Sequence, residues 1–281
     1  MSGEGSLRLA FSTLTCPAWS MEQVVEAANS CGYQGVELRA LGGEILDASM
    51  PPAERRRIKR LADDAGIAIC CVDCSVRLAS GGEPDVVARE LFGFLELARE
   101  WESPLVRVFP GPWPSANTQD QVMDAMVAIL DRTLPAAERL GVAVALETHD
   151  SFASAILVGE LLARVPHHAF GALWDIYQPH LLGETPHQVF AALGHRILHV
   201  HFKDARRIGE MPNGWQLAPL GAGDLPVRAI LDGLRHRGYD GWLSVEWPKL
   251  WHPELAEPED VLPQHAEVLR GWLNASTNQE G

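Results

Sequence analysis

The feature that most constrains the fold is a short apolar segment followed by a longer amphipathic one, repeated eight times along the 281 residues. The short segments predict strands and the longer ones predict helices. The predicted strands cover residues 7–14, 35–39, 67–74, 105–110, 142–149, 170–176, 197–203 and 242–247. The predicted helices cover residues 20–31, 51–65, 84–101, 117–140, 154–164, 186–193, 226–237 and 258–273. Eight such units predict an α/β protein with the (β/α)8 fold of a TIM barrel.

The size of the chain agrees with one barrel, which typically needs about 250 residues. Hydrophobic residues make up 47% of the chain, enough for a large core. No shift in composition marks a second domain. Residues 1–281 are therefore predicted to form a single TIM-barrel domain, with residues 1–5 and 275–281 as frayed tails.

Glycines and prolines mark the expected helix boundaries. Four glycines follow amphipathic stretches, as C-terminal caps do: Gly32, Gly66, Gly141 and Gly238. Pro226 suits the first turn of its helix, where a missing N–H is tolerated. Pro135 falls inside a predicted helix and is expected to kink or divide it.

Residues of metal-binding types lie at the carboxyl ends of four successive predicted strands: Glu147, Asp175, His201 and Glu246. In a parallel barrel those ends converge on one mouth, where such enzymes carry their chemistry. Side chains alternate across a strand, and all four residues lie on the face opposite the bulky apolar one. The bulky face is expected to meet the helices, and the other face to point into the barrel.

The strand predicted at 197–203 illustrates this alternation. One face carries Leu198, Val200 and Phe202. The other face carries His199, His201 and Lys203. His199 and Lys203 are therefore expected to point inward beside His201.

The four residues form a ligand set of three carboxylates and one imidazole, in which hard oxygen donors dominate. This set predicts one divalent metal, with Mn²⁺ the first expectation and Mg²⁺, Co²⁺ or Zn²⁺ as alternatives. Any one of them alone could be a satisfied polar residue of the core. Four at one depth on neighbouring strands would cost too much desolvation without a purpose, which favours a metal-dependent enzyme. Glu147 and Glu246 are the candidate acid–base pair, because carboxylates can bind a metal and also exchange a proton.

The composition argues against several classes of partner. The chain has 23 basic and 37 acidic residues and a net charge of −14, so no nucleic-acid partner is expected. No apolar run reaches the roughly 18 residues of a membrane helix, and the N-terminus lacks a signal pattern. Five cysteines, an odd number, suit reduced thiols better than a disulfide framework. We therefore expect a cytoplasmic protein without a membrane partner, and leave open whether it forms a homo-oligomer.

Five short motifs resemble those of the sugar isomerase/epimerase superfamily, which has the xylose-isomerase-like TIM barrel. The motifs are Ala-Leu-Glu-Thr-His at 145–149, Leu-Trp-Asp-Ile at 173–176, His-Val-His-Phe-Lys-Asp at 199–204, Pro-Leu-Gly-Ala-Gly-Asp at 219–224 and Tyr-Asp-Gly-Trp-Leu-Ser-Val-Glu at 239–246. The resemblance covers nearly the whole chain. It implies that Glu147, Asp175, His201 and Glu246 bind one divalent metal and that the two glutamates shuttle a proton.

Several neighbouring residues are candidates for binding the substrate. Lys203 could bind a substrate oxygen, and His149 has the same parity as Glu147 one step further out. Arg207 is expected in a loop at the mouth, where it resembles a substrate-contacting arginine of related epimerases; the alternative is a solvated surface arginine. Trp113, in the loop after the strand at 105–110, could wall off the site or simply pack.

Many ketose epimerases carry a histidine three residues after the metal-binding aspartate, where this chain has Gln178. Gln178 is therefore a candidate substrate contact that departs from the family pattern. Arg107, Glu37 and Arg39 are also inward by parity. We expect them to form a buried ion network that braces Glu147 rather than contacts substrate.

The favoured function is a divalent-metal-dependent sugar isomerase or epimerase that transfers a proton next to a carbonyl through an enediolate. The first alternative is a metal-dependent dehydratase of a keto-polyol of the inosose or dehydroshikimate type, because the same deprotonation can expel a β-hydroxyl. The substrate would be a small sugar or keto-polyol. Two further alternatives are more remote: a non-catalytic sugar-binding barrel and a DNA-repair enzyme of the endonuclease IV type. The DNA-repair enzyme needs additional histidines, and the net negative charge of this chain opposes binding to DNA.

Overall fold

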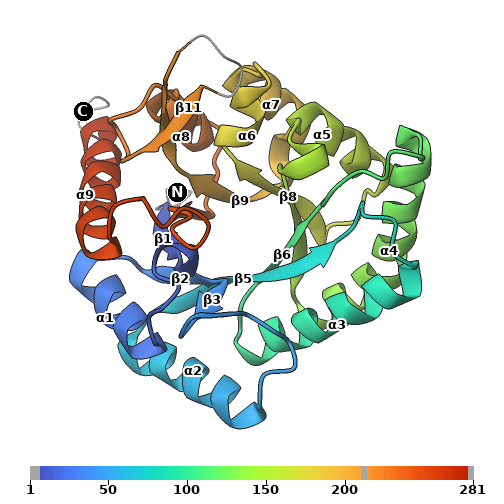
Figure 1. Ribbon diagram of the computed structural model, residues 1–281, viewed down its shortest axis with the longest axis horizontal. Helices are drawn as coiled ribbons and strands as arrows, with labels where there is room; N and C mark the ends of the chain where they lie inside the picture. The colour runs from blue at the N-terminus through green and yellow to red at the C-terminus, as the bar shows by residue number, and fades with distance from the viewer. Residues whose placement is uncertain (1–6, 210–213, 278–281) are drawn as a thin grey trace, which may run out of the picture.

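The computed structural model describes residues 7–209 and 214–277. Its eight parallel barrel strands close into a ring in the order β1-β12-β9-β8-β7-β6-β5-β2 (Figure 1). These strands are β1 (Arg8–Ser12), β2 (Gly35–Leu38), β5 (Ala68–Arg77), β6 (Leu105–Phe109), β7 (Ala143–Glu147), β8 (Phe170–Asp175), β9 (Ile197–Phe202) and β12 (Trp242–Val245). The ring closes where β1 pairs with β12, so the predicted TIM barrel is confirmed.

The helices that follow the strands form an outer ring around the barrel (Figure 1). They are α1 (Met21–Cys31), α2 (Pro52–Ala65), α3 (Pro84–Glu100), α4 (Gln119–Leu140), α5 (Ala155–Arg164), α7 (Pro186–Leu193), α8 (Val227–His236) and α9 (Pro258–Thr277). Because α9 continues to Thr277, residues 275–277 are helical and the predicted C-terminal tail begins too early. Residues 1–5 and 278–281 lie outside the described part of the chain.

The glycine boundaries are where the sequence places them, but the prolines behave differently. Gly32, Gly66 and Gly141 are left-handed C-terminal caps, whereas Gly238, also left-handed with φ 68°, lies one residue beyond Arg237, the C-cap of α8. Pro135 does not divide α4, which is assigned as one helix of 22 residues. Pro226 is the residue before α8 rather than part of its first turn, with φ −77° and ψ 47°.

The barrel interior changes from apolar to charged along the strands. Small and apolar side chains form a separate cluster inside the barrel: Ala10, Cys70, Cys71, Leu105, Ala145, Leu173 and Trp242. Acidic and basic side chains of the barrel strands, or of residues that directly follow these strands, are also buried: Glu37, Arg39, Asp73, Arg107, Glu147, Asp175, His199, His201, Lys203 and Glu246. Buried charges need partners, so this concentration predicts a connected polar network.

The prediction of which face of the strand carries Leu198 was wrong. Leu198 packs against the interior cluster instead of facing the helices. The pairing of β8 with β9 shifts there, from Ala172 opposite Ile197 to Leu173 opposite His199, so Leu198 has no partner in the register. Such an irregularity changes the face on which the extra residue lies. Val200 and Phe202 pack in the main core, as the alternation predicts.

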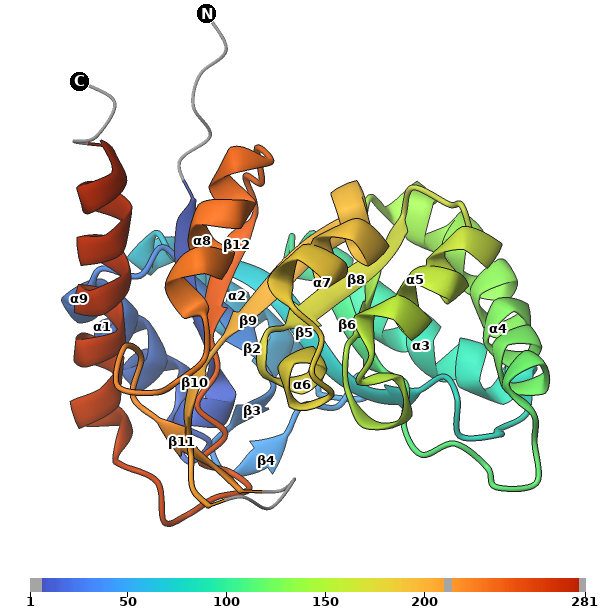
Figure 2. The same ribbon diagram turned by 90° about the horizontal axis from the view of Figure 1, so that it is seen from above.

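Additional short elements extend beyond the carboxyl ends of the strands. They are the hairpin of β3 (Ala40–Leu41) and β4 (Glu44–Ile45), the helix α6 (Tyr177–Leu181), the hairpin of β10 (Asp204–Arg207) and β11 (Trp215–Ala218), and 3-10 turns at Thr13–Thr15 and Asp150–Phe152. A third 3-10 turn, Gly194–Arg196, precedes β9. Figure 2 shows α6 and both hairpins on the same side of the barrel. Within the described ranges, no helix is long and apolar enough to cross a membrane.

Candidate functional site

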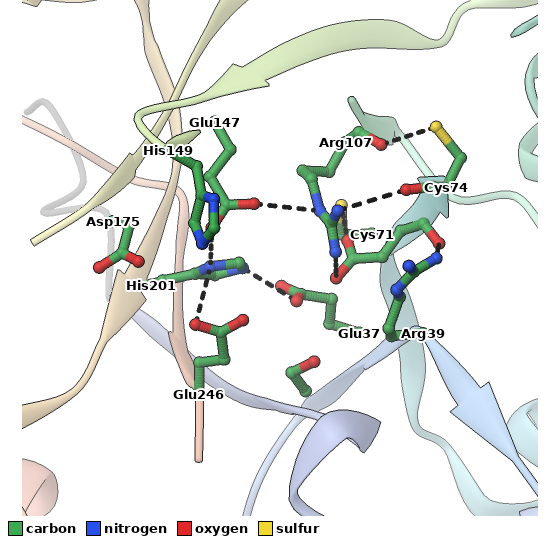
Figure 3. A network of polar contacts seen from close by, with 12 residues as sticks. Glu37, Arg39, Cys71, Cys74, Arg107, Glu147, His149, Asp175, His201 and Glu246 are labelled. Atoms are coloured by element: carbon green, nitrogen blue, oxygen red, sulfur yellow. Dashed lines mark hydrogen bonds and ion pairs between the residues drawn. The ribbon is translucent and has the colours of Figure 1, made fainter. Parts of the chain in front are cut away.

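His201, on β9, lies at the centre of the polar network and is fully buried. Its Nδ1 atom is 3.3 Å from Glu147 Oε1 and 3.5 Å from Glu246 Oε2. Donor atoms of these three residues lie within 4.8 Å of one another. In Figure 3 the two carboxylates approach His201 from opposite sides. Three of the four predicted metal ligands therefore converge on one point.

The other ring nitrogen of His201 is held by Glu37, at the end of β2. His201 Nε2 is 2.9 Å from Glu37 Oε1, and His199 Nε2 is 2.7 Å from Glu37 Oε2. Burial lowers the pKa of His201, but the carboxylates of Glu37, Glu246 and Glu147 outweigh burial and hold the pKa well above its usual value. In a neutral His201, donation from Nε2 to Glu37 would leave the Nδ1 lone pair facing Glu147 and Glu246.

Asp175, the fourth predicted ligand, is not part of that convergent group. Lys203 Nζ is 2.9 Å from Asp175 Oδ2 and also contacts Glu246 Oε2. The other Asp175 oxygen accepts a hydrogen bond from the backbone N–H of Tyr177, at 2.9 Å. Lys203 is thus inward, as predicted, and joins Asp175 to Glu246 through its ammonium group.

Glu147 has a cation on the side away from His201. Arg107 Nε lies 3.4 Å from Glu147 Oε2, and Arg107 Nη2 donates to Asp73 Oδ2 at 2.9 Å. Burial raises the pKa of Glu147, but Arg107 and His201 outweigh burial and hold the pKa well below the usual range. Glu147 is therefore an ionised carboxylate at neutral pH.

The expected bracing network is only partly as predicted. Of the three residues expected there, Arg107 contacts Glu147, whereas Glu37 binds the two histidines. Arg39 donates to the backbone oxygen of Asp73 and to Ser75 Oγ. Asp73 was not predicted as part of this network, although the alternation of side chains in the strand at 67–74 places it on the same face as Cys71, the inner one.

The remaining predicted substrate groups occupy different positions around the mouth. His149 is half-buried, is 2.9 Å from Asp150 Oδ1, and stacks edge-on against Phe109. Gln178 is half-buried in α6. Trp113 is half-buried, stacks on Phe152 and donates to a backbone oxygen, so its described contacts are packing contacts.

Arg207 differs from its predicted place. It belongs to strand β10 rather than to a loop, and its side chain is exposed. Its backbone N–H donates to Asp224 Oδ2 at 2.8 Å. The position is on the mouth side of the barrel, because β10 follows directly from the carboxyl end of β9 (Figure 2).

The residues around His201 Nδ1 fit a divalent ion. Glu147 Oε1 lies 3.3 Å and Glu246 Oε2 3.5 Å from Nδ1, so two carboxylates and one imidazole present their donor atoms to the same point. Carboxylate and imidazole donors suit Mn²⁺, Co²⁺ or Zn²⁺, and Glu37 supplies the outer hydrogen bond that metal-binding histidines normally make.

Two other groups of close donors fit a metal less well. In the group of Glu37, His199 and His201, both imidazoles already contact the Glu37 carboxylate through Nε2. In the group of Glu37, Cys71 and Asp73, the Cys71 thiol donates to Asp73. Burial raises the pKa of that thiol well above its usual value, so a thiolate ligand is disfavoured.

A closed parallel barrel with a polar cluster at the carboxyl ends of its strands defines the class of TIM-barrel proteins with a site at the mouth. The sequence profile of the family described as xylose isomerase-like TIM barrel matches residues 25–272. The chain therefore belongs to the xylose isomerase-like TIM-barrel family.

Known relatives in sequence include epimerases and dehydratases. The chain is 29% identical over 119 residues to an inosose dehydratase of Lacticaseibacillus casei, which covers 38% of each chain. It is 28% identical over 142 residues to a fructoselysine 3-epimerase of Escherichia coli O157:H7, which covers 49% of each. The matched stretches span only 37% to 60% of the lengths of the curated relatives.

Solved structures with the same fold match over almost the whole chain. A D-tagatose 3-epimerase-like protein has a TM-score of 0.78 at 19% identity and covers 98% of this chain and 100% of its own. The IOLI protein, solved with a bound zinc atom, has a TM-score of 0.78 at 18% identity and covers 96% of this chain and 99% of its own. At these identities the likeness supports the fold alone.

Proposed function

We propose that the protein is a divalent-metal-dependent isomerase or epimerase that moves a proton next to the carbonyl of a small sugar. The observation that carries this proposal is the arrangement of two buried carboxylates, Glu147 and Glu246, around His201 Nδ1. Glu147, Asp175, His201 and Glu246 would hold the ion. When bound, a divalent ion would polarise the substrate carbonyl and its neighbouring hydroxyl, which acidifies the C–H between them.

In this proposal the two glutamates would transfer the proton at one substrate carbon. They approach His201 from opposite sides in Figure 3, so a substrate lying between them would expose its two faces to different carboxylates. One carboxylate removes the proton to give an enediolate. Return of the proton to the neighbouring carbon is isomerisation, and return to the opposite face of the same carbon is epimerisation.

The surrounding side chains would bind and orient the substrate. Lys203 Nζ, between Asp175 and Glu246, is a donor for an oxygen that gains negative charge. Burial lowers the pKa of His149, but the hydrogen bond to Asp150 and the nearby charges of Glu147 and Asp175 outweigh burial and raise the pKa above its usual value. Gln178, Arg207 and Trp113 would complete the substrate contacts from α6, β10 and the loop after β6.

The second candidate function is dehydration of a keto-polyol, favoured by the sequence match to inosose dehydratase. It would use the same first step, because a carbanion next to a carbonyl can expel a β-hydroxyl. The two functions differ in product, since dehydration yields an unsaturated or rearranged carbonyl compound and water.

A panel of ketoses, inososes and dehydroshikimate, incubated with the protein and Mn²⁺ in D₂O, tests the proposal. Deuterium at the carbon next to the carbonyl, abolished by chelation and restored by Mn²⁺, Co²⁺ or Zn²⁺, is the expected result. Loss of water from a substrate would select the dehydratase instead. Glu147→Gln and Glu246→Gln retain an oxygen donor but remove the basic carboxylate, and should lower exchange about 10²–10⁴-fold.

Metal binding and the acid–base role of the two glutamates are tested separately. A protein that retains no metal after purification in Mn²⁺ or Zn²⁺ would point to a sugar-binding barrel without catalysis. Near-normal turnover in both glutamine variants would show that another group is the base.

A further inference from the structure

The candidate metal ligands occupy only one half of the barrel mouth. They come from four adjacent strands, β7, β8, β9 and β12. The opposite half is formed by β1, β2, β5 and β6. A substrate held between Glu147 and Glu246 and extending toward this second half would meet its side chains with the part that does not react.

Arg39, two residues after Glu37 on the same face, is the cation of this second half. Only 6% of the residue is exposed. Its Nη1 donates to the backbone oxygen of Asp73 at 3.3 Å and to Ser75 Oγ at 2.9 Å. Both hydrogen bonds use one end of the guanidinium group and orient it, as a binding group needs to be oriented.

The guanidinium of Arg39 has no carboxylate partner within residues 7–209 and 214–277: no ion pair and no hydrogen bond from Nε or Nη2 is present there. The Asp73 carboxylate is engaged elsewhere, because one oxygen accepts from Arg107 and the other from the Cys71 thiol. A buried cation without a counterion is costly, and such groups are normally paired or bind a ligand. Consistently, burial and the neighbouring Arg107 lower the pKa of Arg39 to about 10.

Arg39 lies close enough to the candidate site to interact with it. The Glu147 carboxylate is one of the charges that raise the pKa of Arg39. The Arg39 guanidinium is 5.9 Å from the centre of the Phe109 ring, and the same ring packs edge-on against His149, next to the site. In the view of Figure 3, Arg39 lies on the side of Glu37 away from His201.

We propose that Arg39 binds an anionic group of the substrate, so that the substrate is a sugar acid or polyol acid rather than a neutral ketose. This inference rests on the proposed function and names its substrate class. Nε and Nη2 form the edge of a guanidinium group that binds a carboxylate through two parallel hydrogen bonds. A carboxylate is favoured over a phosphate because the nearby ionised Glu147 opposes a second negative charge.

Three ligands without an aldehyde or ketone group test the inference separately from catalysis: sorbitol, D-gluconate and D-glucitol 6-phosphate. Gluconate differs from sorbitol only in one terminal carboxylate, and none of the three is an aldose or ketose that the proposed reaction could convert. Binding is measured by calorimetry on the Mn²⁺-loaded protein and again after chelation. We expect gluconate to bind at least about tenfold more tightly than sorbitol, with an affinity that falls as salt is added.

Substitutions test whether Arg39 causes the preference for gluconate over sorbitol. Arg39→Gln should weaken gluconate binding about tenfold to a hundredfold and leave sorbitol binding within about twofold. Arg39→Lys should recover part of the preference, because it restores the charge without the planar edge. Arg56→Gln, which removes an exposed arginine of α2, is the control for net charge and should change neither affinity. Circular dichroism and melting confirm that the variants fold.

Several results would overturn the inference. Wild-type protein that does not distinguish gluconate from sorbitol, whether it binds both or neither, has no anion site. A preference that survives Arg39→Gln and is lost in Arg207→Gln would move the site to β10. Tighter binding of D-glucitol 6-phosphate than of gluconate would overturn the choice of a carboxylate. None of these outcomes depends on turnover, so failure of the isomerase proposal remains distinguishable.

Discussion

At the scale of single residues, the two ring nitrogens of His201 have different tasks. Nε2 contacts the Glu37 carboxylate at 2.9 Å, and Nδ1 faces the carboxylates of Glu147 and Glu246. The Glu37 contact fixes both the tautomer and the orientation of the ring. Glu37 is thus a positioning residue, which acts on the candidate metal site through His201.

Glu37→Ala is expected to weaken metal binding about 10–100-fold, because outer partners of metal-binding histidines contribute this much. Glu37→Gln should have a smaller effect, since its amide oxygen can still accept from one histidine. Titration of the metal-free protein with Co²⁺ or Zn²⁺ measures both affinities. Glu96→Gln, an exposed change on α3, is the control, and unchanged affinity in Glu37→Ala would refute the positioning role.

Arg107 is expected to act chiefly on stability. It is fully buried and its guanidinium group contacts two carboxylates, those of Asp73 and Glu147. Arg107→Ala leaves both without their cation and should lower the free energy of unfolding by about 3–5 kcal/mol. Urea unfolding monitored by circular dichroism checks this. Unchanged stability with lost activity would instead place Arg107 in contact with substrate.

At the scale of elements, the hairpin β10–β11 and the loop before α8 are held together by one carboxylate. The oxygens of Asp204 accept four backbone N–H groups, from Ala205, Gly221, Gly223 and Leu225. A side chain at Gly223 would place its Cβ 2.1 Å from Asp204 Oδ1. Glycine is required there because the backbone approaches the carboxylate closely.

Asp204→Ala should destabilise the protein on the order of 3 kcal/mol, because several N–H groups lose a charged acceptor together. Asp224→Asn is a matched control on the same loop, since exposed Asp224 is described as accepting one N–H, that of Arg207. It should cost at most about 1 kcal/mol. Denaturant midpoints of the two variants are compared. Equal losses of stability in both would show that the four hydrogen bonds to Asp204 do not contribute more than the single one to Asp224.

Most strands and helices could be predicted from the sequence, whereas the register between strands could not. Strands and helices were predictable because their apolar periods, 2 and 3.6, are local properties of the chain. The shift between β8 and β9 was not, since a register irregularity depends on the neighbouring strand. For the same reason Leu198 was assigned to the wrong face.

At the scale of the whole molecule, α9 covers the place where the barrel closes. His265 of α9 stacks edge-on against Trp247, which follows β12, at 5.6 Å between ring centres. Neither ring nitrogen of His265 has a hydrogen-bond partner within the described residues. Burial lowers the pKa of His265 to about 3. The folded protein therefore keeps this histidine neutral.

This buried histidine should make the fold sensitive to acid. Below an unfolded-state pKa of about 6.5, the unfolded chain binds a proton that the folded chain excludes, so stability is lost as pH falls from about 6.5 toward 3. From pH 7 to pH 5 the loss from His265 is about 2 kcal/mol. His265→Leu should remove this part of the pH dependence.

Unfolding free energies of wild type and His265→Leu at pH 7 and pH 5 measure the effect. His187→Leu, at an exposed position of α7, is the control and should keep the wild-type pH dependence. A His265→Leu variant that loses as much stability as wild type between the two pH values would contradict the assignment.

The sequence by itself determined the number and order of the βα units and the four strand ends that carry candidate ligands, because periodicity and strand alternation need no tertiary contact. Only the tertiary structure decided which atoms meet. It brings Glu147 and Glu246 to His201, connects Asp175 to Lys203 instead, and pairs Arg107 with Asp73 across neighbouring strands. Contacts between residues far apart in sequence depend on barrel closure and strand register, which arise from the packing of all eight strands together.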